Sequence, residues 1–274
     1  HISVKYIDFI KAHTNAKVMY YGHDLHFLRE YREYELTGDL VCKKSSDDWK
    51  KKELSLMRKA DYVYYPSVIE ENTIREIDDS INVKAIPAYI FDTIEKVQYD
   101  TLERKDIMFI GGFNHKPNVD GVLWFTNEIL PYLVEELPDL KIHILGSNTP
   151  EEVKKIAGGN IIIEGFVTDE QLNDFYGNSL MSIVPLRYGA GIKGKVIEAM
   201  KNGVPVVTTS IGAEGILGAE NVLCIEDDAK KFAQAIVDLH DDADRLKWMS
   251  QKSQEYIAEN YSEKSAIKTI GKDF

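Results

Sequence analysis

Residues 185–207 hold the highest density of glycines and charged side chains that could bind an anionic ligand. Between a strand-like apolar run and a helical one lie three glycines and three basic residues: Gly189, Gly191, Gly194, Arg187, Lys193 and Lys195. Glycines let backbone N–H groups surround an anion, and basic side chains neutralise its charge. The sequence therefore predicts a loop that wraps a phosphate or diphosphate group.

Glu198 lies just over one turn into the helix expected after this loop. Side chains on a helix lean toward its N-terminus, so the carboxylate should point back toward the same pocket. Diphosphate oxygens would repel it, whereas ribose hydroxyls one step farther along a nucleotide can donate hydrogen bonds to it. We interpret Glu198 as a ribose ligand; the alternative is a solvated surface glutamate.

A second glycine turn begins at Gly111 and Gly112, after the strand-like run 107–110, and leads into a helix with Pro117 in its first turn. Such a turn lets backbone approach a ligand, and the helix N-terminus offers free N–H groups to an anion. The spacing G-x-G-x-x-G is absent, so a dinucleotide site is not predicted. A tight turn without a ligand is the alternative.

These loops require parallel sheets to position them. Short β-branched runs alternate with longer amphipathic stretches, which is typical of α/β proteins with doubly wound parallel sheets. In the first part we expect strands at 17–21, 62–65 and 83–86 and helices at 24–36, 48–59 and 67–77. In the second we expect strands at 107–110, 141–145, 161–164, 181–184, 204–208 and 222–225, followed by helices at 229–239, 244–259 and 263–272. Six parallel strands make a complete Rossmann-like domain, whereas three make only half of one.

The domain boundaries follow from this pattern. We expect a partial N-terminal Rossmann-like domain at 1–90, a linker at 91–104, a C-terminal domain at 105–260, and a last helix at 261–274 that packs back on the N-terminal domain. The chain opens on His1 and on what reads as the end of a helix. We therefore expect the full-length protein to extend upstream by most of another βαβ set.

Composition excludes several classes of protein. The 274 residues suit two domains, and 45 acidic against 33 basic residues give a formal charge of −12, which disfavours nucleic acid and allows at most peripheral membrane contact. Only Cys42 and Cys224 are present, without the spacing of a zinc site, so a reducing cytoplasm is expected. No metal is assigned, because the acid pairs Asp47–Asp48 and 241–244 fall where helix N-termini favour acids.

The stretch 185–209, continuing through 212–216, closely resembles the nucleotide-binding segment of retaining, nucleotide-sugar-dependent glycosyltransferases with the GT-B fold (group 1, family 4 type). Gly165, Phe166 and Val167 resemble that family's base-contacting turn, and residues 24–30 resemble its acceptor-side motif. The resemblance implies two Rossmann-like domains facing a cleft, with the donor bound by the C-terminal one.

Two departures from the family pattern concern the donor site. The family commonly has two glutamates eight positions apart; Glu198 matches the second, but the first falls on Ala190. The backbone of residues 189–192, from Gly189 to Ile192, is expected to contact the donor sugar instead. The family's Arg and Lys after the first strand are also missing, and Lys193 is the expected replacement, ahead of Arg187, His115 and Lys116.

The function implied by the resemblance is transfer of a hexosyl group from a nucleoside-diphosphate sugar to a glycan or other hydroxyl acceptor, with retention of configuration. Lys193 and Arg187 would stabilise the departing diphosphate, and Asp24 and His26 would line the acceptor or donor-sugar side. No cofactor is expected. Two alternatives stay open: a nucleotide-sugar epimerase of similar fold, and a non-catalytic nucleotide-sugar-binding subunit, the latter favoured by Ala190 and the incomplete first domain.

Overall fold

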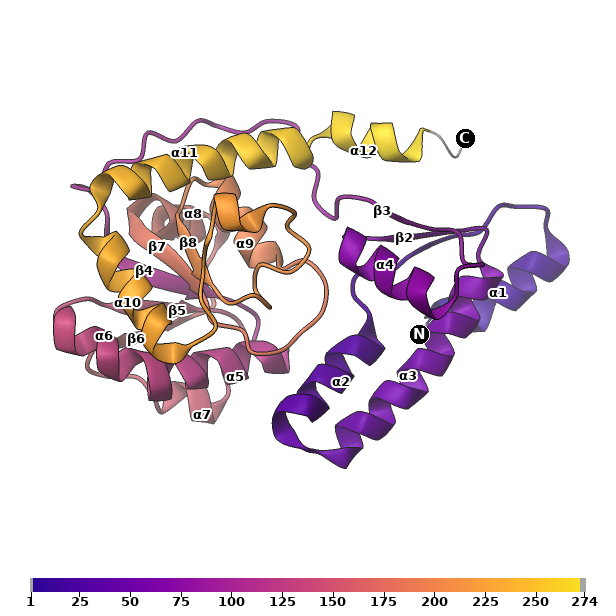
Figure 1. The fold of residues 1–274 in the computed structure, drawn as a ribbon, viewed down its shortest axis with the longest axis horizontal. Helices are drawn as coiled ribbons and strands as arrows, with labels where there is room; N and C mark the ends of the chain where they lie inside the picture. Colours follow the sequence, from indigo (N-terminus) through magenta and orange to yellow (C-terminus); the bar gives the residue numbers. More distant parts are fainter. Residues whose placement is uncertain (1, 272–274) are drawn as a thin grey trace.

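The computed structural model describes residues 2–271, which form two lobes, each built around a parallel sheet (Figure 1). The first sheet has the order β1-β2-β3, and all three strands match expectation in position. Its strands and helices are α1 (Ile2–His13), β1 (Met19–Tyr21), α2 (His26–Thr37), α3 (Leu40–Lys59), β2 (Tyr62–Tyr65), α4 (Val68–Ile77) and β3 (Val83–Ala85). The predicted α/β class is confirmed.

Helix α3 is longer than predicted. Asp39 caps its N-terminus by accepting a hydrogen bond from the Val41 backbone N–H at 2.8 Å, so the helix begins eight residues before the predicted start at Asp48. Asp47 and Asp48 therefore lie inside the helix, and Asp47 pairs with Lys43 at 3.3 Å. The capping role predicted for this acid pair is wrong. With α2, the longer α3 forms a helical hairpin that projects from the first lobe (Figure 1).

The second sheet has six parallel strands in the order β6-β5-β4-β7-β8-β9, so the predicted six-stranded sheet is confirmed. The strands are β4 (Lys105–Ile110), β5 (Ile142–Leu145), β6 (Ile161–Gly165), β7 (Ser179–Val184), β8 (Val206–Thr208) and β9 (Cys224–Ile225). The chain order reverses between β4 and β7. Ligands of such sheets bind outside the carboxyl ends of the strands at this switch point, and both predicted glycine loops start there.

The helices of the second lobe cover both faces of this sheet. They are α5 (Lys116–Trp124), a π-helical turn (Phe125–Ile129), α6 (Leu130–Glu136), α7 (Glu151–Lys154), α8 (Asp169–Asn178), α9 (Gly194–Lys201), a 3-10 turn (Ala219–Asn221), α10 (Ala229–His240) and α11 (Ala243–Asn260), while α12 (Glu263–Ile270) follows α11 and does not cover the sheet (Figure 1). The single helix expected from Pro117 onward is interrupted by the π turn. Pro131 explains this, since it cannot donate to the helix ladder and its ring crowds the preceding turn.

The linker after β3 runs along α11 (Figure 1). Gln254 on α11 holds it: its Oε1 accepts from Val97 N at 3.1 Å, and its Nε2 donates to Glu95 O at 2.8 Å and Lys201 O at 2.9 Å. Helix α12 continues beyond α11 on the side of β3 (Figure 1). Within residues 2–271, no helix combines the length and apolar character needed to cross a membrane.

Candidate active site

The loop from β7 to α9 has the glycine-dependent conformation that its sequence predicts. Gly189 (φ 146°) and Gly191 (φ 74°) both have positive φ, which residues with a Cβ rarely adopt. The buried Thr209 fixes the start of the loop, because its hydroxyl donates to Leu186 O at 2.5 Å and accepts from Gly212 N at 3.1 Å. The loop is thus held at the carboxyl end of β7, next to the turn after β4.

Lys195 joins the two glycine turns. Its Nζ donates to Asn118 Oδ1 at 2.5 Å, and a Cβ on Gly111 would lie only 2.5 Å from that Nζ, so Gly111 makes room for the ammonium group. Burial, and secondly the charge of Lys193, lower the pKa of Lys195 to about 7. The sequence analysis included Lys195 among the basic loop residues but favoured Lys193 as the cation that binds the diphosphate. No feature of the neighbouring sequence indicates that Lys195 contacts Gly111.

A second group of positive charges surrounds His115, at the start of α5. The pKa of His115 is lowered, first by desolvation and then by the charges of Arg29 and Lys195. Arg29 comes from α2 of the first lobe, where it also pairs with Asp24. Cations from both lobes therefore converge on the turn after β4, which favours binding of an anion there.

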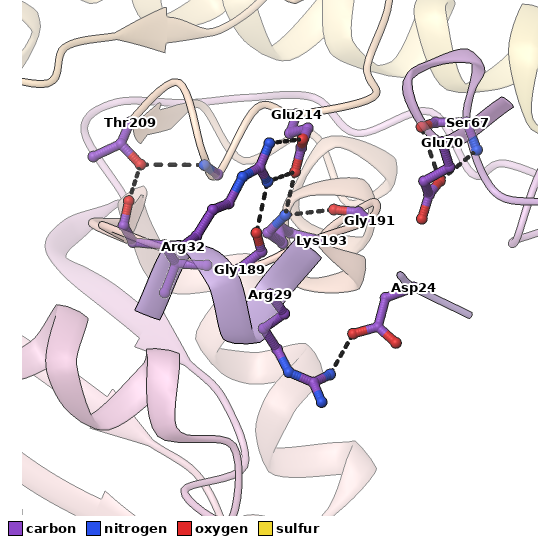
Figure 2. A network of polar contacts seen from close by, with 12 residues as sticks. Asp24, Arg29, Arg32, Ser67, Glu70, Gly189, Gly191, Lys193, Thr209 and Glu214 are labelled. Carbon is purple, nitrogen blue, oxygen red and sulfur yellow. Dashed lines mark hydrogen bonds and ion pairs between the residues drawn. The ribbon is translucent and has the colours of Figure 1, made fainter. Parts of the chain in front are cut away.

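Lys193 lies at the N-cap of α9 and is 8% exposed. Its Nζ donates to Gly191 O and lies 3.4 Å from Glu214 Oε2. Arg32, from α2 in the first lobe, donates to Gly189 O at 2.6 Å and to both oxygens of Glu214 at 2.7 and 2.8 Å (Figure 2). Desolvation lowers the pKa of Lys193, and the Glu214 carboxylate acts in the opposite direction. The sequence could not show this network, because Arg32 and Glu214 are far apart in the chain.

Glu70, on α4 of the first lobe, faces the same loop. One oxygen accepts from the Ser67 N–H at 3.0 Å and from its hydroxyl at 2.9 Å, in a capping box. The other is buried without a hydrogen-bond partner, and a Cβ on Gly191 would lie 3.0 Å from it. Burial raises the pKa of Glu70 to about 7, against the effect of Ser67.

Glu198 is half-buried on α9 between two tyrosines. The Tyr176 hydroxyl donates to Glu198 Oε2 at 3.4 Å. The Tyr89 hydroxyl lies where a Cβ on Gly194 would be, and burial followed by the charge of Glu198 raises the pKa of Tyr89. These contacts hold the Glu198 carboxylate about one helical turn beyond the loop. This is the position predicted from the spacing between Glu198 and Gly194, the first residue of α9.

The predicted base-contacting turn follows β6. Gly165 has a φ of 71°, Phe166 is 75% exposed, and Val167 packs against the core formed with Ile197 and Met200. The Phe166 ring is therefore available for stacking, while Val167 anchors the turn. Ile192, named as a sugar-side residue, is partly buried against the same core.

Arg187 is engaged away from Lys193. It pairs with Asp120 of α5 through Nη2 and through Nε at 3.0 Å, and its guanidinium lies 6.0 Å from the centre of the Trp124 ring. Lys116 is likewise paired, with Glu33 of the first lobe at 2.9 Å. Of the cations that the sequence put forward, the structure thus places Lys193 and Lys195 at the loops and directs Arg187 toward α5.

On the first lobe, His26 begins α2 and stacks on Trp49, with ring centres 4.5 Å apart. Buried Glu53 accepts from His26 Nδ1 at 3.0 Å and from two backbone N–H groups, those of His26 at 3.1 Å and Phe27 at 3.2 Å. The hydrogen bond to Glu53 raises the pKa of His26. Asp24 Oδ1 lies 3.4 Å from His26 Nδ1, so these two predicted residues are adjacent.

Within the described part of the chain, Glu30, Glu33 and Cys42 bring three potential metal-ligand atoms within 4.8 Å of one another. Lys116 already pairs with Glu33, and burial, then the charge of Glu33, raises the pKa of the Cys42 thiol. A thiolate is therefore disfavoured at this position, and we assign no metal to it.

Two parallel α/β lobes, with cations and glycine loops at the switch point of the second, define a GT-B-like protein. Residues 104–242 match the family model described as glycosyl transferases group 1, and the chain belongs to this family of enzymes. An uncharacterized 44.6 kDa protein in the cps region of Klebsiella pneumoniae is 31% identical over 198 residues, or 69% of this chain and 51% of that protein. The chain thus spans about half the length of this curated relative.

Solved structures share the fold. A variant of TarM from S. aureus, solved with fondaparinux, α-GlcNAc-glycerol and UDP, has a TM-score of 0.75 at 18% identity over 95% of this chain and 51% of that one. Sucrose-phosphate synthase from Thermosynechococcus elongatus has a TM-score of 0.71 at 17% identity over 96% of this chain and 68% of that one. The pneumococcal O-GlcNAc transferase GtfA, with UDP and GlcNAc, has a TM-score of 0.62 at 14% identity over 82% and 47%. The predicted GT-B-like fold is confirmed.

Proposed function

We propose that this protein transfers a sugar from a nucleoside-diphosphate sugar to a hydroxyl acceptor with retention of configuration. The observation that carries the proposal is the convergence of Lys193, Lys195 and Arg29 on two glycine turns at the switch point of the second sheet. A diphosphate is the anion that such a surface fits, because it accepts hydrogen bonds from backbone N–H groups and cations together.

The nucleoside would lie along α9 toward Glu198. In this arrangement the Glu198 carboxylate accepts hydrogen bonds from the ribose hydroxyls, and exposed Phe166 stacks on the base. The backbone of the loop around Gly189 and Gly191 replaces the sugar contact that Ala190 cannot make. Gly111 and Gly112 admit the diphosphate next to Lys195.

The chemical step depends on stabilising the leaving group. Charge grows on the diphosphate as the bond to the sugar breaks, so cations held in a partly desolvated site stabilise the transition state more than the ground state. A departing phosphate oxygen takes the acceptor proton on the same face of the sugar, which retains the configuration. Asp24 and His26 face the loop between β7 and α9 (residues 185–193), which we call the donor loop, and line the acceptor or donor-sugar side.

The printed ligands of two structural neighbours support the donor class. The TarM variant and GtfA were both solved with UDP. UDP is therefore the first nucleotide to test, although likeness at this identity concerns the fold alone. The low cysteine count supports a cytoplasmic location, and a hydroxyl of a glycan is the proposed acceptor.

A panel of UDP, GDP, ADP and their hexose derivatives tests the proposal by thermal shift, because a ligand of the folded state raises its Tm. One nucleotide series should raise the Tm, and incubation of that donor with candidate glycan acceptors should release the nucleoside diphosphate and yield a product of unchanged anomeric configuration by NMR. Conversion of the donor sugar without acceptor would support an epimerase, and binding without turnover would support a binding subunit. No Tm change with any nucleotide would contradict the proposal.

A further inference from the structure

Arg32, on α2 of the first lobe, forms hydrogen bonds with the donor loop of the second lobe and with Glu214, which lies beside that loop. It donates three hydrogen bonds to the second lobe, one to Gly189 O and two to the Glu214 carboxylate (Figure 2). The Glu214 side chain is 9% exposed and that of Arg32 is 23% exposed, so water screens this ion pair weakly. The contact joins α2, which also carries His26 and Arg29, to the loop of the second lobe.

Glu214 has two cationic neighbours, and the contacts are unequal. Arg32 binds both carboxylate oxygens at 2.7 and 2.8 Å, in the bidentate geometry that guanidinium and carboxylate favour. Lys193 Nζ reaches only Oε2, at 3.4 Å. Since a bidentate pair is stronger than one long contact, Arg32 is the dominant partner of Glu214. The positive charge of Lys193 is therefore less compensated than its burial beside a carboxylate would suggest.

We propose that Arg32 is a positioning residue: by occupying Glu214, it keeps Lys193 available for the diphosphate of the donor. The inference rests on the proposed function, in which Lys193 stabilises the leaving diphosphate. Without Arg32, Glu214 would have Lys193 as its nearest cation and would draw the ammonium group into a tight ion pair. The acceptor-side helix α2 thereby controls the charge of the donor site.

The test compares the loss of Arg32 alone with the loss of both Arg32 and the Glu214 carboxylate. The substrate is the nucleotide sugar that the nucleotide panel selects. Arg32→Ala should lower kcat for release of its nucleoside diphosphate at least tenfold. The effect on the KM for this substrate should be smaller. Arg32→Ala/Glu214→Gln should recover most of the rate, because glutamine cannot form an ion pair with Lys193. Arg32→Ala/Lys193→Ala should be no slower than Lys193→Ala alone. Arg32→Lys should retain part of the activity.

The matched control is Arg58→Ala, which removes an arginine that pairs with Asp78 at 2.6 Å within the first lobe and should leave the rate within twofold. If Arg32 were merely structural, removing both Arg32 and the Glu214 charge would leave the defect in place or worsen it, and that result would overturn the inference. An Arg32→Ala rate equal to wild type would also overturn it. Wild-type protein that binds no nucleotide would instead overturn the proposed function and, with it, this inference.

Discussion

Lys195 on α9 donates a hydrogen bond to Asn118 on α5, with 2.5 Å between Nζ and Oδ1, and so joins the two glycine turns of the second lobe. The ammonium group lies against Gly111, where a side chain would collide with it. This contact places the Lys195 amine, whose pKa is lowered to about 7, where the sheet's switch geometry directs an anionic ligand, and a bound diphosphate would favour its protonated form. Lys195 therefore ranks with Lys193 as a phosphate-binding candidate.

Lys195→Met should weaken binding of the nucleoside diphosphate by about 1.5 to 3 kcal/mol, the usual range for a hydrogen bond to a charged group. The Lys195 Nζ lies 4.3 Å from the centre of the Phe109 ring. Methionine places an unbranched apolar side chain at this ring, so packing should be largely preserved. Isothermal titration calorimetry measures the change, and circular dichroism checks the fold. Unchanged affinity in a folded variant would remove Lys195 from the site.

Glu198→Gln should weaken nucleoside-diphosphate binding by about 1 to 3 kcal/mol if the carboxylate accepts hydrogen bonds from ribose. The matching deoxyribonucleotide should lose affinity for wild type and show little further loss with the variant. Tyr176→Phe is the control, since it removes the 3.4 Å hydrogen bond to Glu198 and leaves the carboxylate in place. Equal losses for the ribo- and deoxyribonucleotide on substitution would argue against a ribose contact.

Lys193→Ala should lower turnover more than it weakens donor binding, because a contact that strengthens as the glycosidic bond breaks affects the rate. Arg187→Ala should affect turnover less, since Arg187 is already paired with Asp120. Its main effect should be on stability, about 0.5 to 1 kcal/mol for a partly exposed ion pair. Steady-state kinetics and urea unfolding separate the two, and a larger kinetic defect in Arg187→Ala would reverse the ranking.

Elements that depend on local pattern were predictable from the sequence, and contacts between distant segments were not. Alternating apolar runs located all nine strands among the described residues, and the loop from Gly189 to Gly194 was recognised from its glycines and bases. The start of α3 was misplaced because acids at Asp47 and Asp48 imitate a helix N-terminus, while Asp39 is the actual cap. Pairings such as Arg32 with Glu214 depend on how the lobes meet, which no local periodicity encodes.

Glu70 should make stability fall as pH rises through the neutral range. Its pKa is raised from 4.5 to about 7 in the native state, so between these values the native protein holds a proton that the unfolded chain releases. The free energy of unfolding should therefore decrease between about pH 5 and pH 8. Glu70→Gln should remove about 1 to 3 kcal/mol of this decrease, on the scale of 1.36 kcal/mol per pKa unit.

Urea unfolding at a series of pH values provides this measurement, because glutamine at the same position can still accept the hydrogen bonds from Ser67 in the capping box. Glu76 is exposed on α4, so Glu76→Gln is the control. This variant should show the same dependence of stability on pH as wild type. A Glu70→Gln profile parallel to wild type would show that Glu70 is ionised and compensated in the native protein.

Calorimetric titration of UDP, GDP and ADP into wild-type protein, Lys195→Met and Glu198→Gln tests the central claim most directly. The claim is that a nucleoside diphosphate binds at the switch point of the second sheet. We predict that wild type binds one of the three nucleotides and that each variant binds it at least about fivefold more weakly, as expected for loss of a hydrogen bond to a charged group. Absence of binding in wild type, or equal affinity in all three folded proteins, would contradict it.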